Sequence, residues 1–141
     1  MSVAMTKVDK FVLNLGSKIF NLASDQLKVA LTNTAPTAST VNQYSDLTSP
    51  LATTNLSGAT PFNITTTSYT QTSGTAKLIL ADLTLTATGA VGPFRYIVLY
   101  SDTATNDEII GFYDYGSSVT LASGDTFTID FDASNGVLTV A

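Results

Sequence analysis

The sequence predicts a mainly β, antiparallel, β-sandwich- or jelly-roll-like single domain, preceded by an N-terminal amphipathic helix. Three observations support this prediction. The chain has 141 residues and no cysteine, a length that suits one domain able to bury a core without disulfides. Short apolar runs alternate with polar residues at a period of two over most of the chain. Gly, Ser, Asn and Asp residues separate these runs about every ten positions, as is typical of sandwiches and jelly rolls.

Residues 1–23 are expected to form an N-terminal arm and helix. Residues 1–6 have no fold signal of their own, so we expect an extended arm. Thr6 is a candidate N-cap, and Gly16 lowers the stability of the helix by about 1 kcal/mol relative to alanine. Six apolar residues recur at steps of three and four, which predicts one apolar helix face; they are Val8, Phe11, Val12, Leu15, Ile19 and Leu22.

Residues 24–141 are expected to form the β domain. Leu and Val alternate with Lys28 and Ala30 over residues 27–31, which predicts a half-buried strand. The segment 32–60 is irregular and rich in Thr and Ser. It is either a surface excursion that contacts a partner or a pair of short edge strands.

Strand signals follow at short intervals after this segment. Residues 94–100 are almost entirely apolar, so we expect them to form a central strand. Asn135-Gly136 predicts a two-residue hairpin turn between the strands that flank it. The expected strands lie near 62–70, 76–87, 94–101, 108–115, 118–121, 126–131 and 137–140.

The composition argues against several classes of function. The chain has no His and no Cys, so it cannot build a Ser-His-Asp triad, a thiol nucleophile or a thiolate zinc site. Six basic and eleven acidic residues give a net charge of −5, which disfavours nucleic acid and anionic lipid as partners. No apolar run approaches the roughly 18 residues of a membrane span. We therefore expect a non-enzymatic protein without cofactor or metal, although a hydrolase that uses two carboxylates, with Asp114 as its best candidate, stays an alternative.

Two acidic segments are candidate cation sites. Asp102, Asn106, Asp107 and Glu108 cluster in one expected loop and offer the hard oxygen ligands that Ca²⁺ prefers. Their spacing does not match an EF-hand loop, and acidic turns between strands are common. In residues 130–136 the glycine falls at the seventh position, whereas the EF-hand calcium loop has glycine at the sixth. We interpret both segments as solvent-exposed turns.

Two features around the central strand could contact a partner. Tyr113, Asp114 and Tyr115 could line a carbohydrate groove, although aromatic residues on neighbouring strands more commonly reflect sheet packing. Arg95 is the single arginine and lies in the most apolar expected strand. It either pairs with a carboxylate inside the fold or recognises a partner at an interface.

Several segments together resemble a known family. A short amphipathic helix runs into 24–31 (SDQLKVAL), and strand patterns follow at 95–103 (RYIVLYSDT), 109–116 (IIGFYDYG) and 124–131 (GDTFTIDF), closing on Gly-Val-Leu at 136–138. This pattern resembles a family of small virion proteins of tailed bacteriophages. The resemblance covers nearly the whole chain except 32–60, where this chain departs from a longer Gly- and Tyr-rich stretch. Its motifs are strand patterns and not catalytic signatures.

The resemblance implies a non-enzymatic component of the phage particle. The first expectation is a capsid decoration (cement) protein on the outer capsid surface, which binds and stabilises the lattice of the major capsid protein. The alternative is a tail- or fibre-associated module, or a module that binds carbohydrate or a host receptor. A homotrimer is expected, because decoration proteins usually match a local symmetry axis. The candidate partner-contact residues are Val3, Met5, Phe11, Ile19 and Arg95.

Overall fold

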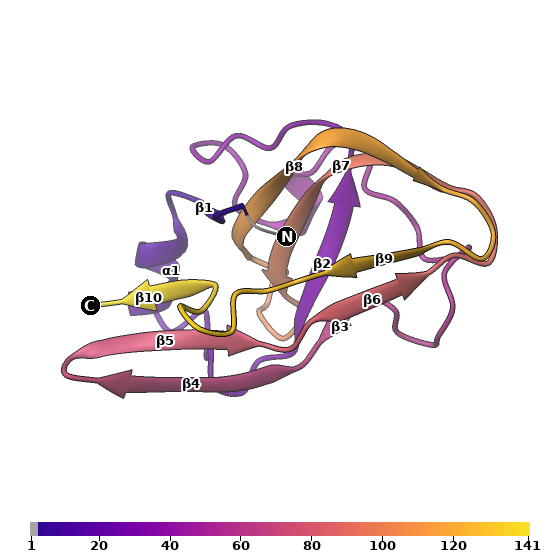
Figure 1. Ribbon diagram of the computed structural model, residues 1–141. Helices are drawn as coiled ribbons and strands as arrows, with labels where there is room; N and C mark the ends of the chain where they lie inside the picture. Colours follow the sequence, from indigo (N-terminus) through magenta and orange to yellow (C-terminus); the bar gives the residue numbers. More distant parts are fainter. Residues whose placement is uncertain (1–2) are drawn as a thin grey trace.

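Antiparallel strands in two layers form the core of the structure, a computed structural model that describes residues 3–141 (Figure 1). The expected class, a mainly β sandwich-like domain with one N-terminal helix, is confirmed. The elements are β1 (Thr6–Lys7), α1 (Phe11–Gly16), β2 (Leu27–Thr32), the 3-10 helix η1 (Tyr44–Asp46), β3 (Asn63–Ile64), β4 (Thr66–Thr72), β5 (Thr75–Leu80), β6 (Leu83–Thr86), β7 (Val91–Ser101), β8 (Ile109–Leu121), β9 (Thr126–Ile129) and β10 (Leu138–Val140).

The larger layer is a five-stranded sheet in the order β1-β8-β7-β2-β3. Its middle strand is β7, as the apolar run at 94–100 predicts, and Ile97, Val98 and Leu99 are fully buried. β2 pairs with β7 along its whole length. The prediction of a half-buried β2 is wrong, because Ala30 is buried as well as its apolar neighbours, so both faces of this strand are covered.

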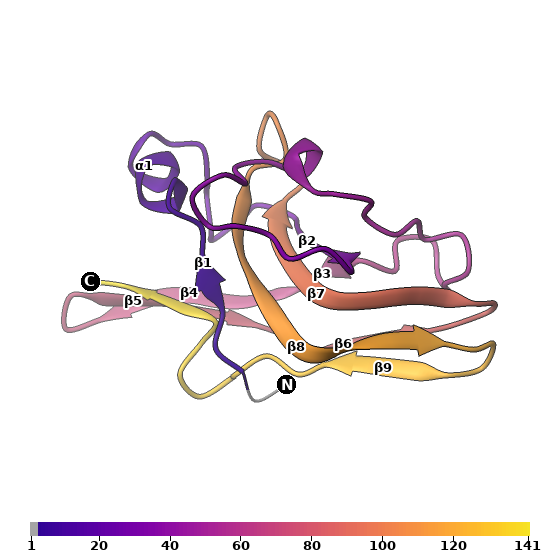
Figure 2. The same cartoon turned by 90° about the horizontal axis from the view of Figure 1, so that it is seen from above.

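The second layer combines the sheet β10-β5-β4 with the two-stranded ribbon of β6 and β9. Figure 2 shows this ribbon lying alongside β7 and β8. Aromatic contacts join the layers: the Phe94 and Phe127 rings meet edge to face with centroids 5.1 Å apart, and Tyr113 lies against Phe131 at 6.2 Å. The core therefore fills the space between the two layers.

The helix is much shorter than its apolar pattern predicts. The backbone N–H of Val8 donates to Ile110 O and that of Asp9 donates to Ala38 O, so the chain before α1 is held by other segments. Lys18 has φ of 66°, a left-handed conformation that ends the helical path. Thr6 lies in β1 and is not the N-cap. A local pattern cannot anticipate these tertiary hydrogen bonds.

The turn at Asn135-Gly136 does not form the expected hairpin. β9 pairs with β6, whereas β10 pairs with β5. Residues 130–137 therefore connect the β6–β9 ribbon to the sheet that contains β5. Gly136 has φ of 79°, and a Cβ there would lie 2.7 Å from Leu78 O. Glycine is needed for this close approach to β5 as well as for the positive φ.

The segment 32–60 is a surface excursion and not a pair of edge strands. Its regular structure is limited to η1 and two isolated bridges, Gln43 with Glu108 and Leu56 with Ala87. Val41 and Leu56 are buried against the core. The excursion therefore covers part of the larger sheet.

Candidate functional site

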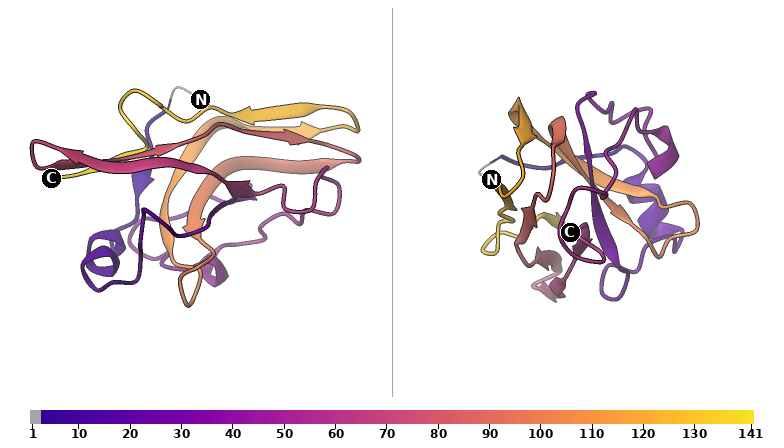
Figure 3. Two further views of the ribbon diagram at one scale, coloured as in Figure 1. Left: turned by 90° about the horizontal axis from the view of Figure 1, so that it is seen from below. Right: turned by 90° about the vertical axis from the view of Figure 1, so that its right-hand side faces the viewer.

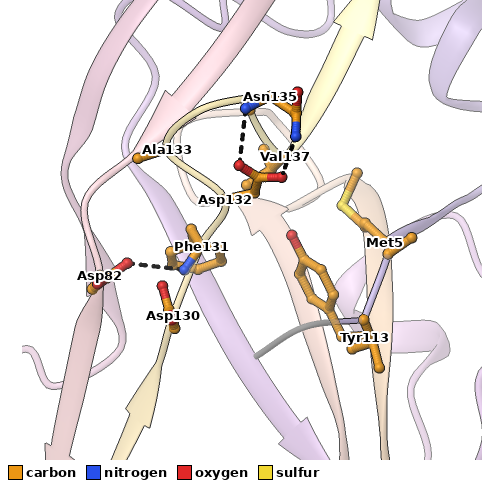
Figure 4. Close-up of a pocket in the computed structure, with 12 residues that line it drawn as sticks. Met5, Asp82, Tyr113, Asp130, Phe131, Asp132, Ala133, Asn135 and Val137 are labelled. Atoms are coloured by element: carbon orange, nitrogen blue, oxygen red, sulfur yellow. Dashed lines mark hydrogen bonds between the residues drawn. The ribbon is translucent and has the colours of Figure 1, made fainter.

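A cleft of about 750 Å³ lies between the N-terminal residues 3–5 and the 130–137 segment (Figure 4). Two expected partner-contact residues, Val3 and Met5, contribute to its wall. The remaining lining residues are Ala4, Asp82, Tyr113, Asp130, Phe131, Asp132, Ala133, Asn135, Gly136 and Val137.

Gly111 positions the N-terminal wall of the cleft. Thr6 and Lys7 pair with Phe112 and Gly111 as the edge strand β1 of the larger sheet. A Cβ on Gly111 would lie 2.6 Å from Thr6 O and 2.9 Å from the Met5 side chain. The arm at 1–6 is therefore not wholly free: its end is a strand, and its first two residues lie outside the described part of the chain.

Aspartates on the opposite wall hold the backbone of the 130–137 segment. Asp82 Oδ1 accepts a hydrogen bond from the Phe131 N–H at 2.9 Å. Asp132 accepts from the Ser134 and Asn135 N–H groups, both at 2.9 Å, and from Asn135 Nδ2 at 3.0 Å. These bonds to Asn135 lower the pKa of Asp132 below its usual value. A carboxylate with a lowered pKa is a poor general base or acid near neutrality, so the hydrogen bonds of Asp132 point to a structural role in holding this turn.

Tyr113 closes the inner end of the cleft. It is 5% exposed, and Figure 4 shows its hydroxyl turned toward the space between Met5 and Asp132. Burial raises the pKa of this hydroxyl to about 12, and the charge of Asp132 adds to the effect. The hydroxyl is therefore neutral over the ordinary pH range.

The acidic loop at 102–108 does not assemble a cation site. Glu108 is buried and its carboxylate accepts hydrogen bonds from the backbone and side-chain nitrogens of Asn106, both at 3.2 Å. Asp102 instead pairs with Lys28 at 3.4 Å. Within residues 3–141, no three acidic side chains are grouped so that they could hold a metal ion.

The Tyr-Asp-Tyr segment of β8 divides its side chains between two faces. Asp114 is exposed, and it binds Arg95 through Nε–Oδ1 at 2.8 Å and Nη2–Oδ2 at 3.1 Å. Tyr113 is buried, and Tyr115 packs its ring edge against Phe127. The alternation of side chains along a strand thus separates the carboxylate from both aromatic rings, which favours the expected sheet packing over the alternative of a carbohydrate groove. Arg95 therefore has a carboxylate partner within the chain, but the pair lies at the surface, with the Arg95 and Asp114 side chains 39% and 46% exposed. A contact of Arg95 with another protein stays a prediction.

Burial in the helix region differs from that expected for residues that contact a partner. Phe11 was expected at a partner contact, but it is 1% exposed and stacks on Phe20 at 5.5 Å, so that expectation is wrong. Ile19 is half-buried. Val12 and Leu13 were not among the expected contacts and are 58% and 60% exposed. Leu13 lies off the apolar stripe in sequence, a signal that could have identified it.

Comparisons with protein-family models, curated proteins and solved structures found no match to this chain. No helix within residues 3–141 is long and apolar enough to cross a membrane. Any assignment of function therefore depends on the residues and their geometry.

Proposed function

We propose that this protein is a non-enzymatic structural component of a tailed-bacteriophage virion, and specifically a capsid decoration (cement) protein. It binds the outer surface of the capsid and stabilises the lattice of the major capsid protein. The proposal includes self-association, with a homotrimer matching a local three-fold axis of the shell. Its starting point is the resemblance of the strand segments to small virion proteins.

One observation carries the proposal: exposed apolar side chains gather in the N-terminal segment. Large hydrophobic side chains that are exposed within residues 3–141 are Val3, Val12, Leu13 and Tyr115, and three of these precede Asn14. Burying such side chains against a partner is favourable by roughly 25 cal/mol per Å² of apolar surface. We therefore place the attachment surface in the N-terminal segment, at Val12 and Leu13 of α1.

The remaining surface is compatible with a contact role. Ser and Thr occupy 38 positions, whereas only 12% of residues are charged. Contacts made through hydroxyls and apolar groups depend less on ionic strength than exposed ion pairs do. Binding of a protein across capsid joints adds stability by mass action and needs no chemistry.

The test is add-back of purified protein to capsids of the phage that encodes it, prepared without this protein. Wild-type protein should bind at saturating occupancy and raise the temperature at which the capsids disrupt. The double variant Val12→Ser/Leu13→Ser should bind at least about tenfold more weakly, since it loses more than 1.4 kcal/mol of apolar contact. Tyr115→Ser is the matched control, because it removes an exposed apolar side chain far from α1 in sequence and should bind normally.

Two results would contradict the proposal in different ways. Full occupancy by the Val12/Leu13 variant would show that α1 is not the attachment surface and would direct attention to residues 32–60. Failure of the wild-type protein to bind capsids would refute the decoration role. Binding to purified tails in the same assay would then identify the tail-associated alternative.

A further inference from the structure

β4 forms an open edge of the second layer. Its residues pair with β5 on one side, for example Tyr69 with Leu78 and Thr70 with Lys77. β4 is the outermost strand of its sheet, and no backbone hydrogen bond from another segment of residues 3–141 reaches Thr66–Thr72 on the other side. Figures 1 and 3 show the β4–β5 hairpin extending beyond the rest of the layer, where another chain can approach it.

Apart from the irregular pairing with β5 between Thr66 and Ser68, this edge lacks the features that usually prevent strand addition. Natural edge strands are shortened, or carry charged residues or proline, because their free N–H and C=O groups otherwise pair with other chains. The two edges of the larger sheet, β1 and β3, are only two residues long each. β4 has seven residues, TTSYTQT, without charge or proline. The other edge of the smaller sheet, β10, has three residues, so β4 is the longest edge strand of these two sheets and the best suited to accept another strand.

We propose that β4 of a second copy of this chain pairs antiparallel with this edge across a two-fold axis. An antiparallel strand is its own complement, because two identical edges related by a two-fold axis place donors opposite acceptors. The chain has a net charge of −5, so two copies repel each other over much of their surface. The uncharged β4 edge is a place where they can meet without opposing like charges.

Such a contact joins two three-stranded sheets into one six-stranded sheet. The pairing of β4 with β5 shifts register between Thr66 and Ser68, so the regular part of the β4 edge is Ser68–Thr72. A contact of this size lies at the small end of protein interfaces, where association is weak and reversible. The contact is isologous and by itself closes at two copies, and it is separate from the three-fold contact of the proposed homotrimer.

The chain offers a closely matched pair of variants for the test. Thr70 on β4 and Thr139 on β10 are both exposed, and both lie directly opposite Lys77 on the intervening strand β5. Thr70→Glu and Thr139→Glu therefore introduce the same charge next to the same lysine within one molecule. The proposed two-fold axis passes the midpoint of Ser68–Thr72, so Thr70 faces Thr70 of the second copy. Only Thr70→Glu therefore places like charges against each other across this contact.

The measurement is sedimentation equilibrium over about a hundredfold range of concentration, with circular dichroism to confirm the fold. Wild-type protein and Thr139→Glu should associate equally, whereas Thr70→Glu should associate at least about tenfold more weakly. An equimolar mixture of Thr70→Glu and Thr70→Lys should recover association, because opposite charges then face each other.

Three results would overturn the inference: a wild-type protein that stays monomeric over the whole range, association that Thr70→Glu leaves unchanged, or a mixture that does not recover. The inference goes beyond the decoration role and does not depend on it, since the measurement needs no capsid. A failure of capsid binding leaves the two-fold contact standing. Loss of the two-fold contact leaves capsid binding standing, whereas a wild-type protein that stays monomeric also removes the homotrimer from the proposed function.

Discussion

At the scale of single residues, the docking of the N-terminal strand depends on a missing side chain at Gly111. The Thr6 carbonyl and the Met5 side chain occupy the space where a Cβ would lie. Gly16, in contrast, has no neighbouring atom within 4 Å of its would-be Cβ. The sequence does not show which of the two glycines has no room for a side chain; the atoms that surround each one in the folded chain do.

We expect Gly111→Ala to displace β1 from the edge of β8. The added methyl group meets backbone at 2.6 Å, which cannot be relieved by rotating a side chain. The substitution should destabilise the protein by about 1–3 kcal/mol, measured by urea denaturation, and should speed hydrogen exchange at the amides of residues 6–8. Gly16→Ala is the control, and it should leave stability unchanged or raise it by less than about 1 kcal/mol. Equal stability of Gly111→Ala and wild type would contradict this account.

At the scale of elements, α1 places apolar side chains both in the core and at the surface. Phe11 packs against Phe20 inside, while Val12 and Leu13 face outward. The helix has six residues and no side-chain hydrogen bond at its N-cap, so it is too short to be stable without packing. Phe11 is the residue that provides this packing, together with the strand β1 that precedes it.

We expect truncation on the buried face of α1 to destabilise the protein much more than truncation on its exposed face. Phe11→Ala should cost about 3–5 kcal/mol, because it removes a buried aromatic ring. Val12→Ser/Leu13→Ser should cost less than about 1 kcal/mol, because both side chains are already in water. Chemical denaturation of the isolated protein measures both values. A large loss from the double variant would show that these residues stabilise the fold and would remove them as an attachment surface.

At the scale of the whole molecule, two layers enclose tyrosines as well as aliphatic side chains. Burial raises the pKa of Tyr113 to about 12 and raises the pKa of Tyr100 further, with Tyr44 and nearby aspartates adding to the effect on Tyr100. In the unfolded chain a tyrosine ionises near its ordinary pKa of about 10. At a pH above about 10, the folded domain therefore keeps these hydroxyls protonated while the unfolded chain releases their protons.

We expect the stability of the domain to fall as the pH rises above about 10 and toward 12. The unfolded chain releases protons in this range while the folded state still binds them, so unfolding becomes more favourable. Tyr113→Phe should reduce this loss by about 1 kcal/mol at pH 11, because each unit of pKa difference corresponds to about 1.4 kcal/mol. Urea denaturation at pH 8, 10 and 11 measures the change, and equal pH dependence of variant and wild type would contradict it.

The sequence alone determined the class of the fold and most of its strands, because period-two patterning is a local property of each strand. The apolar run at 94–100 identified the central strand because a strand covered on both faces has few polar residues. The absence of His and Cys is read directly from the composition, and it argued against common catalytic sites without any knowledge of the fold. Val3 is exposed and Met5 is half-buried, and the contact of either residue with a partner stays a prediction.

Only the tertiary structure decided which strands pair, where the helix ends and which apolar residues stay exposed. Asn135-Gly136 has the composition of a hairpin, but β9 and β10 have different partners, and no local signal specifies a partner distant in sequence. Phe11 and Val12 are neighbours of similar hydropathy, yet packing against Phe20 buries one and leaves the other in water. The physical reason is that periodicity defines a face, whereas burial depends on what packs against that face.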